Sequence, residues 1–182
     1  MSNKSVESTL DKRSYKISSS FNDMSDAANK LSYLNQFIIN FLRYAKKKYI
    51  IGVRKTHTQF YIRMLNNYNM DTIFENNPKY GEETSFVTNK GDEFGICLRD
   101  KGNNSDKFHN ENILQFVMLH ELTHLGCISY GHDKEFWSMF KVVLEDAVEF
   151  GLYTPVDYKA NPINYCGLLV TYNPYFSDKN TT

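Results

Sequence analysis

The sequence predicts an α+β fold, because it combines helical periodicity with short strand-forming segments. Apolar residues recur at spacings of three and four in three stretches, and two β-branched and aromatic segments flank the turn Asn89-Lys90-Gly91-Asp92. With 182 residues, 41% hydrophobic and 23% charged, the chain has the size and composition of one globular domain. We therefore expect a single domain over residues 23–182, preceded by a polar, non-periodic and flexible arm over residues 1–22.

The first helix is predicted from Asp23 to about residue 45. Its apolar stripe consists of Leu31, Leu34, Phe37, Ile38, Phe41, Leu42 and Ala45. The cations at 46–48 suit its last turn, where they complement the helix dipole. Residues 49–53 are β-branched and aromatic enough for a strand, and residues 59–65 fit either a helix or a strand.

A hairpin is predicted next, with strands over residues 84–88 and 93–99. A loop over residues 100–110 then leads to a helix over about 111–125, which ends near Gly126.

A further strong helix is predicted over residues 134–150, with Asp133 as its cap and Gly151 as its stop. The tail from Tyr153 onward contains three prolines among aromatic residues. These prolines, Pro155, Pro162 and Pro174, predict extended segments that wrap the domain rather than another helix.

The charge balance excludes a general attraction to nucleic acid. Lys plus Arg and Asp plus Glu each total 21, so the formal net charge is zero and DNA binding would need a local patch. The candidate patch consists of Lys46, Lys47, Lys48, Arg54 and Lys55.

The cysteines and the apolar stretches predict an intracellular protein without a membrane anchor. Three cysteines, Cys97, Cys127 and Cys166, argue against a disulfide framework and for a reducing compartment, cytoplasmic or nuclear. Residues 1–20 lack the apolar core of a signal peptide, and residues 31–45 are too short and too polar to span a bilayer.

The segment His120-Glu121-Leu122-Thr123-His124 is the strongest functional motif. Two histidines four residues apart on a helix present their rings on one face and can bind one ion. An adjacent carboxylate can take a proton from a metal-activated water, so the pattern is typical of zinc peptidases with Glu121 as the base.

A catalytic zinc usually has three protein ligands, so one more ligand is expected downstream. His132 is the first candidate, because the connection from His124 is short and contains two glycines that can reverse the chain. Glu145 and Glu149 on the next helix are the competing ligands.

Three neighbours of the motif have open roles. Asp133 either orients a ligand ring or caps the helix, and Tyr130 either stabilises an oxyanion or packs in its loop. Cys127 either restrains the metal site or is a buried thiol. His57 and His109 lack ligand spacing.

With these residues identified, the sequence resembles the WLM and SprT-like (Spartan-type) metallopeptidases. The resemblance covers residues 84–150 and rests on His120 to His124, on Gly131-His132-Asp133-Lys134-Glu135-Phe136-Trp137 and on Gly95-Ile96-Cys97-Leu98-Arg99. It is strongest to stand-alone members encoded by large DNA viruses, which the tail segment Asn164-Tyr165-Cys166-Gly167 also resembles.

This resemblance implies a minimal zincin-like fold, in which a small, mostly antiparallel sheet packs on the motif helix and the next helix supports it. It implies one Zn²⁺ on His120, His124 and His132, and a peptide that pairs with the strand carrying Gly95, Ile96, Cys97 and Leu98.

The predicted function is therefore zinc-dependent endopeptidase activity on a protein or peptide substrate. Two alternatives remain: a non-catalytic, zinc-stabilised interaction module, and a peptidase specialised for DNA-associated or crosslinked proteins. The seven residues between the second and third histidine form a longer connection than that of many WLM members, and we expect no appended DNA-binding tail.

Overall fold

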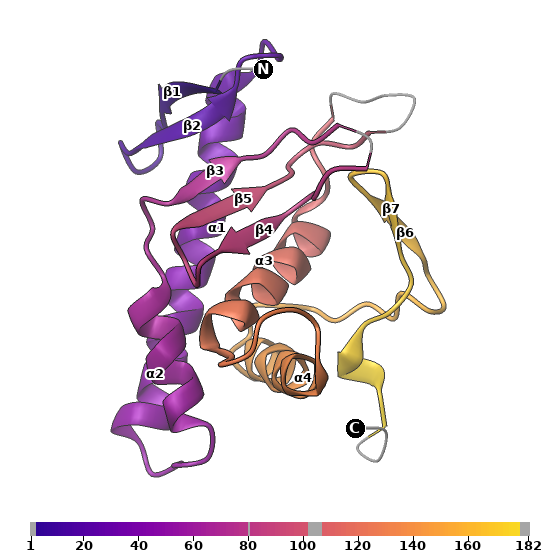
Figure 1. Cartoon of the computed structure of the whole chain (residues 1–182). Helices are drawn as coiled ribbons and strands as arrows, with labels where there is room; N and C mark the ends of the chain where they lie inside the picture. Colours follow the sequence, from indigo (N-terminus) through magenta and orange to yellow (C-terminus); the bar gives the residue numbers. More distant parts are fainter. Residues whose placement is uncertain (1–2, 80, 102–106, 179–182) are drawn as a thin grey trace.

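The computed structural model describes residues 3–79, 81–101 and 107–178 and confirms the α+β class. A five-stranded sheet lies above and beside the helices (Figure 1), in the order β1-β2-β3-β5-β4. Its strands are β1 (Asn3–Glu7), β2 (Ser14–Ser18), β3 (Ile73–Glu75), β4 (Phe86–Thr88) and β5 (Glu93–Ile96).

The sheet is mixed rather than mostly antiparallel. The pairs β1–β2 and β4–β5 are antiparallel, whereas β2–β3 and β3–β5 are parallel. The difference arises because a long helical connection joins β2 to β3 and returns the chain in the same direction.

The predicted flexible arm is wrong for residues 3–18, which form β1 and β2. The burial of β2 alternates: Tyr15 and Ile17 face the core, and Lys16 between them is exposed. The Ser18 amide also donates to the buried Glu75 carboxylate at 3.0 Å. The partners of β2, such as Glu75, lie far along the chain. The local sequence of residues 3–18 therefore shows no periodic pattern that would predict these strands.

Four α-helices occur in the described ranges: α1 (Met24–Ala45), α2 (Thr58–Asn67), α3 (Glu111–Gly126) and α4 (Lys134–Glu149). α1, α3 and α4 agree closely with the predicted helices, and α2 settles the ambiguous segment as a helix. Figure 1 shows α3 beneath β4 and β5, with α4 on its other side. The expected arrangement of a motif helix between a sheet and a supporting helix is present.

The predicted strand over residues 49–53 is wrong, because α1 continues into a π-helical turn, η1 (Lys46–Ile51). Tyr49 is buried there and stacks on Tyr61 of α2, with ring centroids 4.5 Å apart. Its hydroxyl donates to the buried Asp146 carboxylate at 3.0 Å. This tertiary burial outweighs the β propensity of the segment.

The predicted hairpin over residues 84–99 is confirmed. The strand that lies at the edge of the sheet, however, is β4 and not β5, the strand expected to pair with a peptide. β5 lies between β3 and β4, so the segment from Gly95 to Leu98 is internal and β4 is the edge of the sheet. The turn sequence predicted only that these two strands pair with each other. Which of them also met β3 depended on a partner about twenty residues upstream.

The tail contains a second hairpin, β6 (Ile163–Tyr165) with β7 (Leu168–Val170), and a 3₁₀ turn, η2 (Pro174–Phe176). The predicted absence of another α-helix in the tail holds for its described part. The predicted loop before α3 falls partly on residues 102–106, which lie outside the described residues, and Arg99 forms an isolated bridge with Phe108.

A disulfide joins Cys97 to Cys166, so the expectation that these cysteines are unpaired is wrong. They lie 69 residues apart in the sequence, and only the docking of the second hairpin beside β5 brings them together. The cysteine argument for a reducing compartment therefore fails, and the compartment stays a prediction. No helix among the described residues is long and apolar enough to cross a bilayer.

Candidate metal centre

Helix α3 carries the first two candidate ligands. It begins where the Asn110 side chain accepts a hydrogen bond from the Ile113 amide at 3.0 Å. Its remaining faces are apolar and packed against α1, α2, α4 and β4. His120 and His124 lie one turn apart with ring centroids 5.1 Å apart, so the predicted common face is confirmed.

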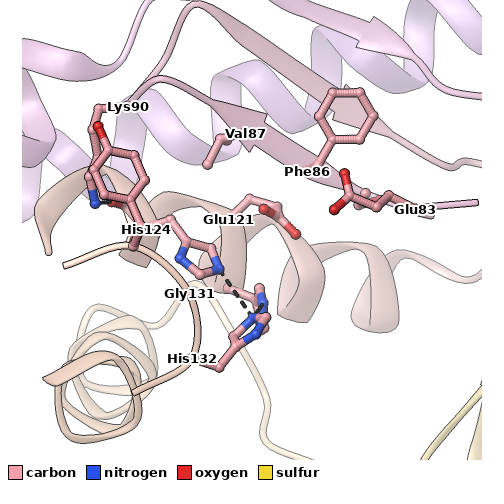
Figure 2. A pocket seen from close by; sticks show the side chains of 11 residues that line it. Glu83, Phe86, Val87, Lys90, Glu121, His124, Gly131 and His132 are labelled. Atoms are coloured by element: carbon pink, nitrogen blue, oxygen red, sulfur yellow. Dashed lines mark hydrogen bonds between the residues drawn. The ribbon is translucent and has the colours of Figure 1, made fainter. Parts of the chain in front are cut away.

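His132 returns to the same point from a different segment. Its Nε2 atom is 2.8 Å from Nε2 of His120 and 3.2 Å from Nε2 of His124 (Figure 2). The reversal uses Gly131, whose φ of 82° is readily adopted only by glycine. Within the described part of the chain, these three residues form the one group with metal-ligand spacing, and their ligand atoms all lie within 4.8 Å of one another.

Phe136, in the first turn of α4, supports all three rings. It stacks on His124 with centroids 4.3 Å apart, and lies 4.8 Å from His120 and 4.7 Å from His132. Phe136 is fully buried, so the imidazoles rest on a fixed apolar base.

The electrostatics favour neutral imidazoles. Burial lowers the pKa of His124 to about 4 and lowers the pKa of His120 and of His132 below the usual value. The neighbouring imidazoles lower the pKa of His120 and His124 further. Neutral rings offer nitrogen lone pairs to a cation near pH 7.

Glu121 lies beside the ligands and faces a cavity of about 230 Å³. Its side chain is only 5% exposed, and burial, with a contribution from the nearby Glu83, raises the pKa of its carboxyl to about 8. Among the described residues, none donates a hydrogen bond to this carboxylate. A buried carboxylate without a donor is costly unless a ligand or water completes the site.

One wall of the cavity is the edge strand. Figure 2 shows Phe86 and Val87 of β4 above Glu121 and the histidines, with Glu83 at one end and Lys90 at the other. The cavity therefore lies between the free edge of the sheet and the three rings.

The competing ligands lie elsewhere. Glu145 forms a 3.9 Å ion pair with Lys141, and Glu149 forms one with Lys48. Asp133 caps α4 by accepting from the Phe136 amide at 3.0 Å, which is the capping role of its two predicted alternatives.

Two other residues of the loop differ in their surroundings, and Tyr130 is one of the residues that line the cavity. The ring of Tyr130, 73% exposed, lies 4.4 Å from the Lys90 ammonium. Cys127 is buried and outside the ligand group, and burial raises the pKa of its thiol to about 12.

Sequence reasoning missed several residues around the cavity. Ser85 bonds with the Tyr165 hydroxyl at 2.6 Å and accepts from the Cys97 amide at 3.0 Å, and Tyr165 donates to the Cys97 carbonyl at 2.8 Å. The one sequence feature that pointed to Tyr165 was its place in the tail segment that resembles viral proteins. No sequence feature pointed to Lys90 beyond its place in the predicted turn.

The model of the WLM domain matches residues 53–160, more than half of the chain, including all three histidines and Glu121. The chain belongs to the WLM-domain family. An uncharacterized protein of Acanthamoeba polyphaga mimivirus is 35% identical over 111 residues, which cover 60% of this chain and 55% of the relative. Another, of Invertebrate iridescent virus 6, is 36% identical over 107 residues, 58% of this chain and 56% of the relative.

These relatives confirm the resemblance of this WLM-domain chain to proteins of large DNA viruses. The matched region spans little more than half of their length. No solved structure matches the chain.

Proposed function

We propose that this protein is a zinc-dependent endopeptidase with a zincin-like catalytic domain. The observation that carries the proposal is the convergence of three imidazoles and a buried carboxyl group, which accepts no hydrogen bond from the described residues, on one cavity beneath a free strand edge.

The three histidines fit a zinc ion. Nitrogens about 2.0–2.1 Å from a tetrahedral ion lie about 3.3 Å from one another. The observed separations of 2.8 and 3.2 Å between Nε2 atoms are close to this value. His132 being exposed leaves one side of the site open to solvent, as a catalytic rather than a structural site requires.

In this proposal, zinc held by His120, His124 and His132 supplies a Lewis acid that lowers the pKa of water and polarises a carbonyl. Glu121 takes the proton from the attacking water and passes it to the leaving amine nitrogen. Its carboxylate has no competing donor among the described residues, so both oxygens can turn toward the substrate.

The substrate is proposed to bind as an added strand on β4. Phe86–Thr88 pairs with β5 on one side, and its other side borders the cavity. A peptide in extended conformation can pair with these backbone groups, which places its carbonyl over the histidines. This replaces the internal strand β5 with β4 as the proposed pairing strand.

Action on DNA-associated proteins is a second proposal. Lys46 and Lys47 at the start of η1, and Arg54 and Lys55 between η1 and α2, are exposed, and exposed basic residues favour contact with phosphate. Lys48 is not part of this surface, because it forms ion pairs with Asp146 and Glu149.

The test compares wild type with Glu121→Gln, which removes the base and leaves the ligands. Purified wild type is expected to contain about one zinc per chain and to cleave an unfolded protein substrate. Glu121→Gln is expected to retain the zinc and to lose at least about a hundredfold in rate, the usual contribution of general-base catalysis.

Equal cleavage by both proteins would refute the role of Glu121, and zinc without cleavage in wild type would favour the non-catalytic module. The same assay with double-stranded DNA at two salt concentrations tests the second proposal. Stimulation that weakens with salt supports it, and indifference to DNA contradicts it.

A further inference from the structure

The loop from Cys127 to Gly131 determines where the third histidine lies. His132 precedes α4 and is exposed, so although its ring rests on Phe136, neither a helix nor burial fixes its backbone. Its Nε2 atom nevertheless comes within 2.8 Å of His120. The contacts that hold this loop therefore determine whether the three nitrogens meet.

Lys90 holds the loop from the side of the sheet. It lies in the β4–β5 turn, and its ammonium donates to the His124 carbonyl at 3.0 Å and to the Ser129 carbonyl at 2.5 Å. Its remaining side faces the Tyr130 ring at 4.4 Å. One cation thus joins the backbone of the second ligand to the loop that delivers the third.

The contact to His124 is part of a complete cap on α3. A helix leaves its last four carbonyls without helical partners. Here the Thr123 carbonyl accepts from the Cys127 amide, and those of His124, Leu125 and Gly126 accept from Lys90, Asn67 and Arg63. Lys90 therefore also places a positive charge at the negative end of the helix dipole.

Glu135 holds the same loop from the opposite side. Its carboxylate accepts from the Ile128 amide at 3.0 Å, and from the amide and hydroxyl of Ser129 at 3.0 and 2.7 Å. Ser129 is thus fixed by its carbonyl to Lys90 and by its N–H and O–H to Glu135.

We propose that Lys90 is a positioning residue for the metal site, acting with Glu135 to hold the Cys127–Gly131 loop so that His132 completes the ligand set. The inference rests on the proposed zinc site. Lys90 lines the cavity, yet its ammonium is directed at two carbonyls and a ring, so it acts on the ligands rather than on a substrate.

The test is Lys90→Met, which retains the aliphatic stem and removes the donors. The matched control is Lys141→Met. Lys141 also donates to backbone carbonyls, those of Pro174, Tyr175 and Ser177, but is remote from the ligand loop in its contacts. Zinc affinity is measured by competition with a chromogenic chelator, and folding of each metal-free protein by circular dichroism and urea denaturation.

Lys90→Met is expected to weaken zinc binding about 10–100-fold, as loss of supporting contacts around metal ligands generally does. Lys141→Met should bind zinc like wild type. In a His132→Ala background, Lys90→Met should cause a smaller further loss, because most of its effect passes through His132. The cobalt-substituted Lys90→Met protein should show an altered visible spectrum.

Wild-type affinity and an unchanged cobalt spectrum in a folded Lys90→Met protein would overturn the inference, as would an equal loss with His132 present or absent. If Lys90→Met does not fold, Lys90→Gln, which retains one donor group, replaces it in the same cycle. Wild type that binds no zinc would instead refute the proposed function, so the two failures are distinguishable.

Discussion

Removal of the disulfide is the perturbation whose magnitude follows most directly from the structure. The bond between Cys97 and Cys166 ties the β6–β7 hairpin to the end of β5 and closes a loop with a sequence separation of 69 residues. We expect the double variant Cys97→Ser/Cys166→Ser to fold but to be markedly less stable than the oxidised wild type.

The chain-entropy relation for a loop of 69 residues gives about 15 cal/mol/K, or about 4.4 kcal/mol at 25 °C. A chain of this size loses roughly 2–4 °C in Tm per kcal/mol. The predicted decrease in Tm is therefore about 9–18 °C, and it comes mainly from the greater freedom of the unfolded chain.

The assay is thermal unfolding of the oxidised wild type with and without reductant, beside the double variant. Thiol titration in denaturant counts free cysteines: one in the oxidised protein, Cys127, and three after reduction. Cys127→Ser is the control and should retain the full sensitivity to reductant. Three free thiols before reduction, or a Tm change below about 2 °C on reduction of a confirmed disulfide, would refute the reasoning.

Two further predictions concern ionisation. Because burial raises the pKa of the Cys127 thiol to about 12, native protein should react with a thiol reagent at pH 8 at least about a thousandfold more slowly than denatured protein, and comparable rates would contradict this. Burial also lowers the pKa of His109, His120, His124 and His132, so below pH 6.5 the unfolded chain binds more protons and the metal-free protein should lose stability as the pH falls. The measurement uses Glu121→Gln, because the raised pKa of Glu121 would by itself stabilise the folded protein as the pH falls. In this variant the urea midpoint should decrease from pH 7.5 to pH 5. An unchanged or higher midpoint would contradict the prediction.

The disulfide also bears on the cavity. Tyr165 precedes Cys166 and connects to both Cys97 and Ser85, and Ser85 lines the cavity beside Glu121. The second hairpin therefore supports the start of the edge strand. These contacts were not predicted, because Ser85, Cys97 and Tyr165 come from segments that share no local sequence pattern.

Helical features were predicted well because their evidence is local. The stripe from Leu31 to Ala45 and the cap Asp133 act within a few residues of the helices they define. The apolar run around the histidine motif predicted a buried helix, and α3 is buried on nearly every side.

Strand features were predicted less well because pairing is not local. The segments of β1 and β2 were wrongly predicted to be a flexible arm, and residues 49–53 were wrongly predicted to be a strand. Short polar or aromatic segments take their conformation from the residues that they pack against. The hairpin of β4 and β5 was identified from its turn, but its orientation toward β3 was not.

The sequence by itself determined the spacing of His120, Glu121 and His124 on one helix, the choice of His132 as the first candidate for a further ligand, and the family resemblance. These follow from the i, i+4 geometry of a helix and from a short glycine-containing connection. The tertiary structure alone decided which strand is the free edge, which cysteines pair, and that Lys90 lies on the carbonyl of His124. Those outcomes depend on many weak contacts between distant segments, which no local periodicity encodes.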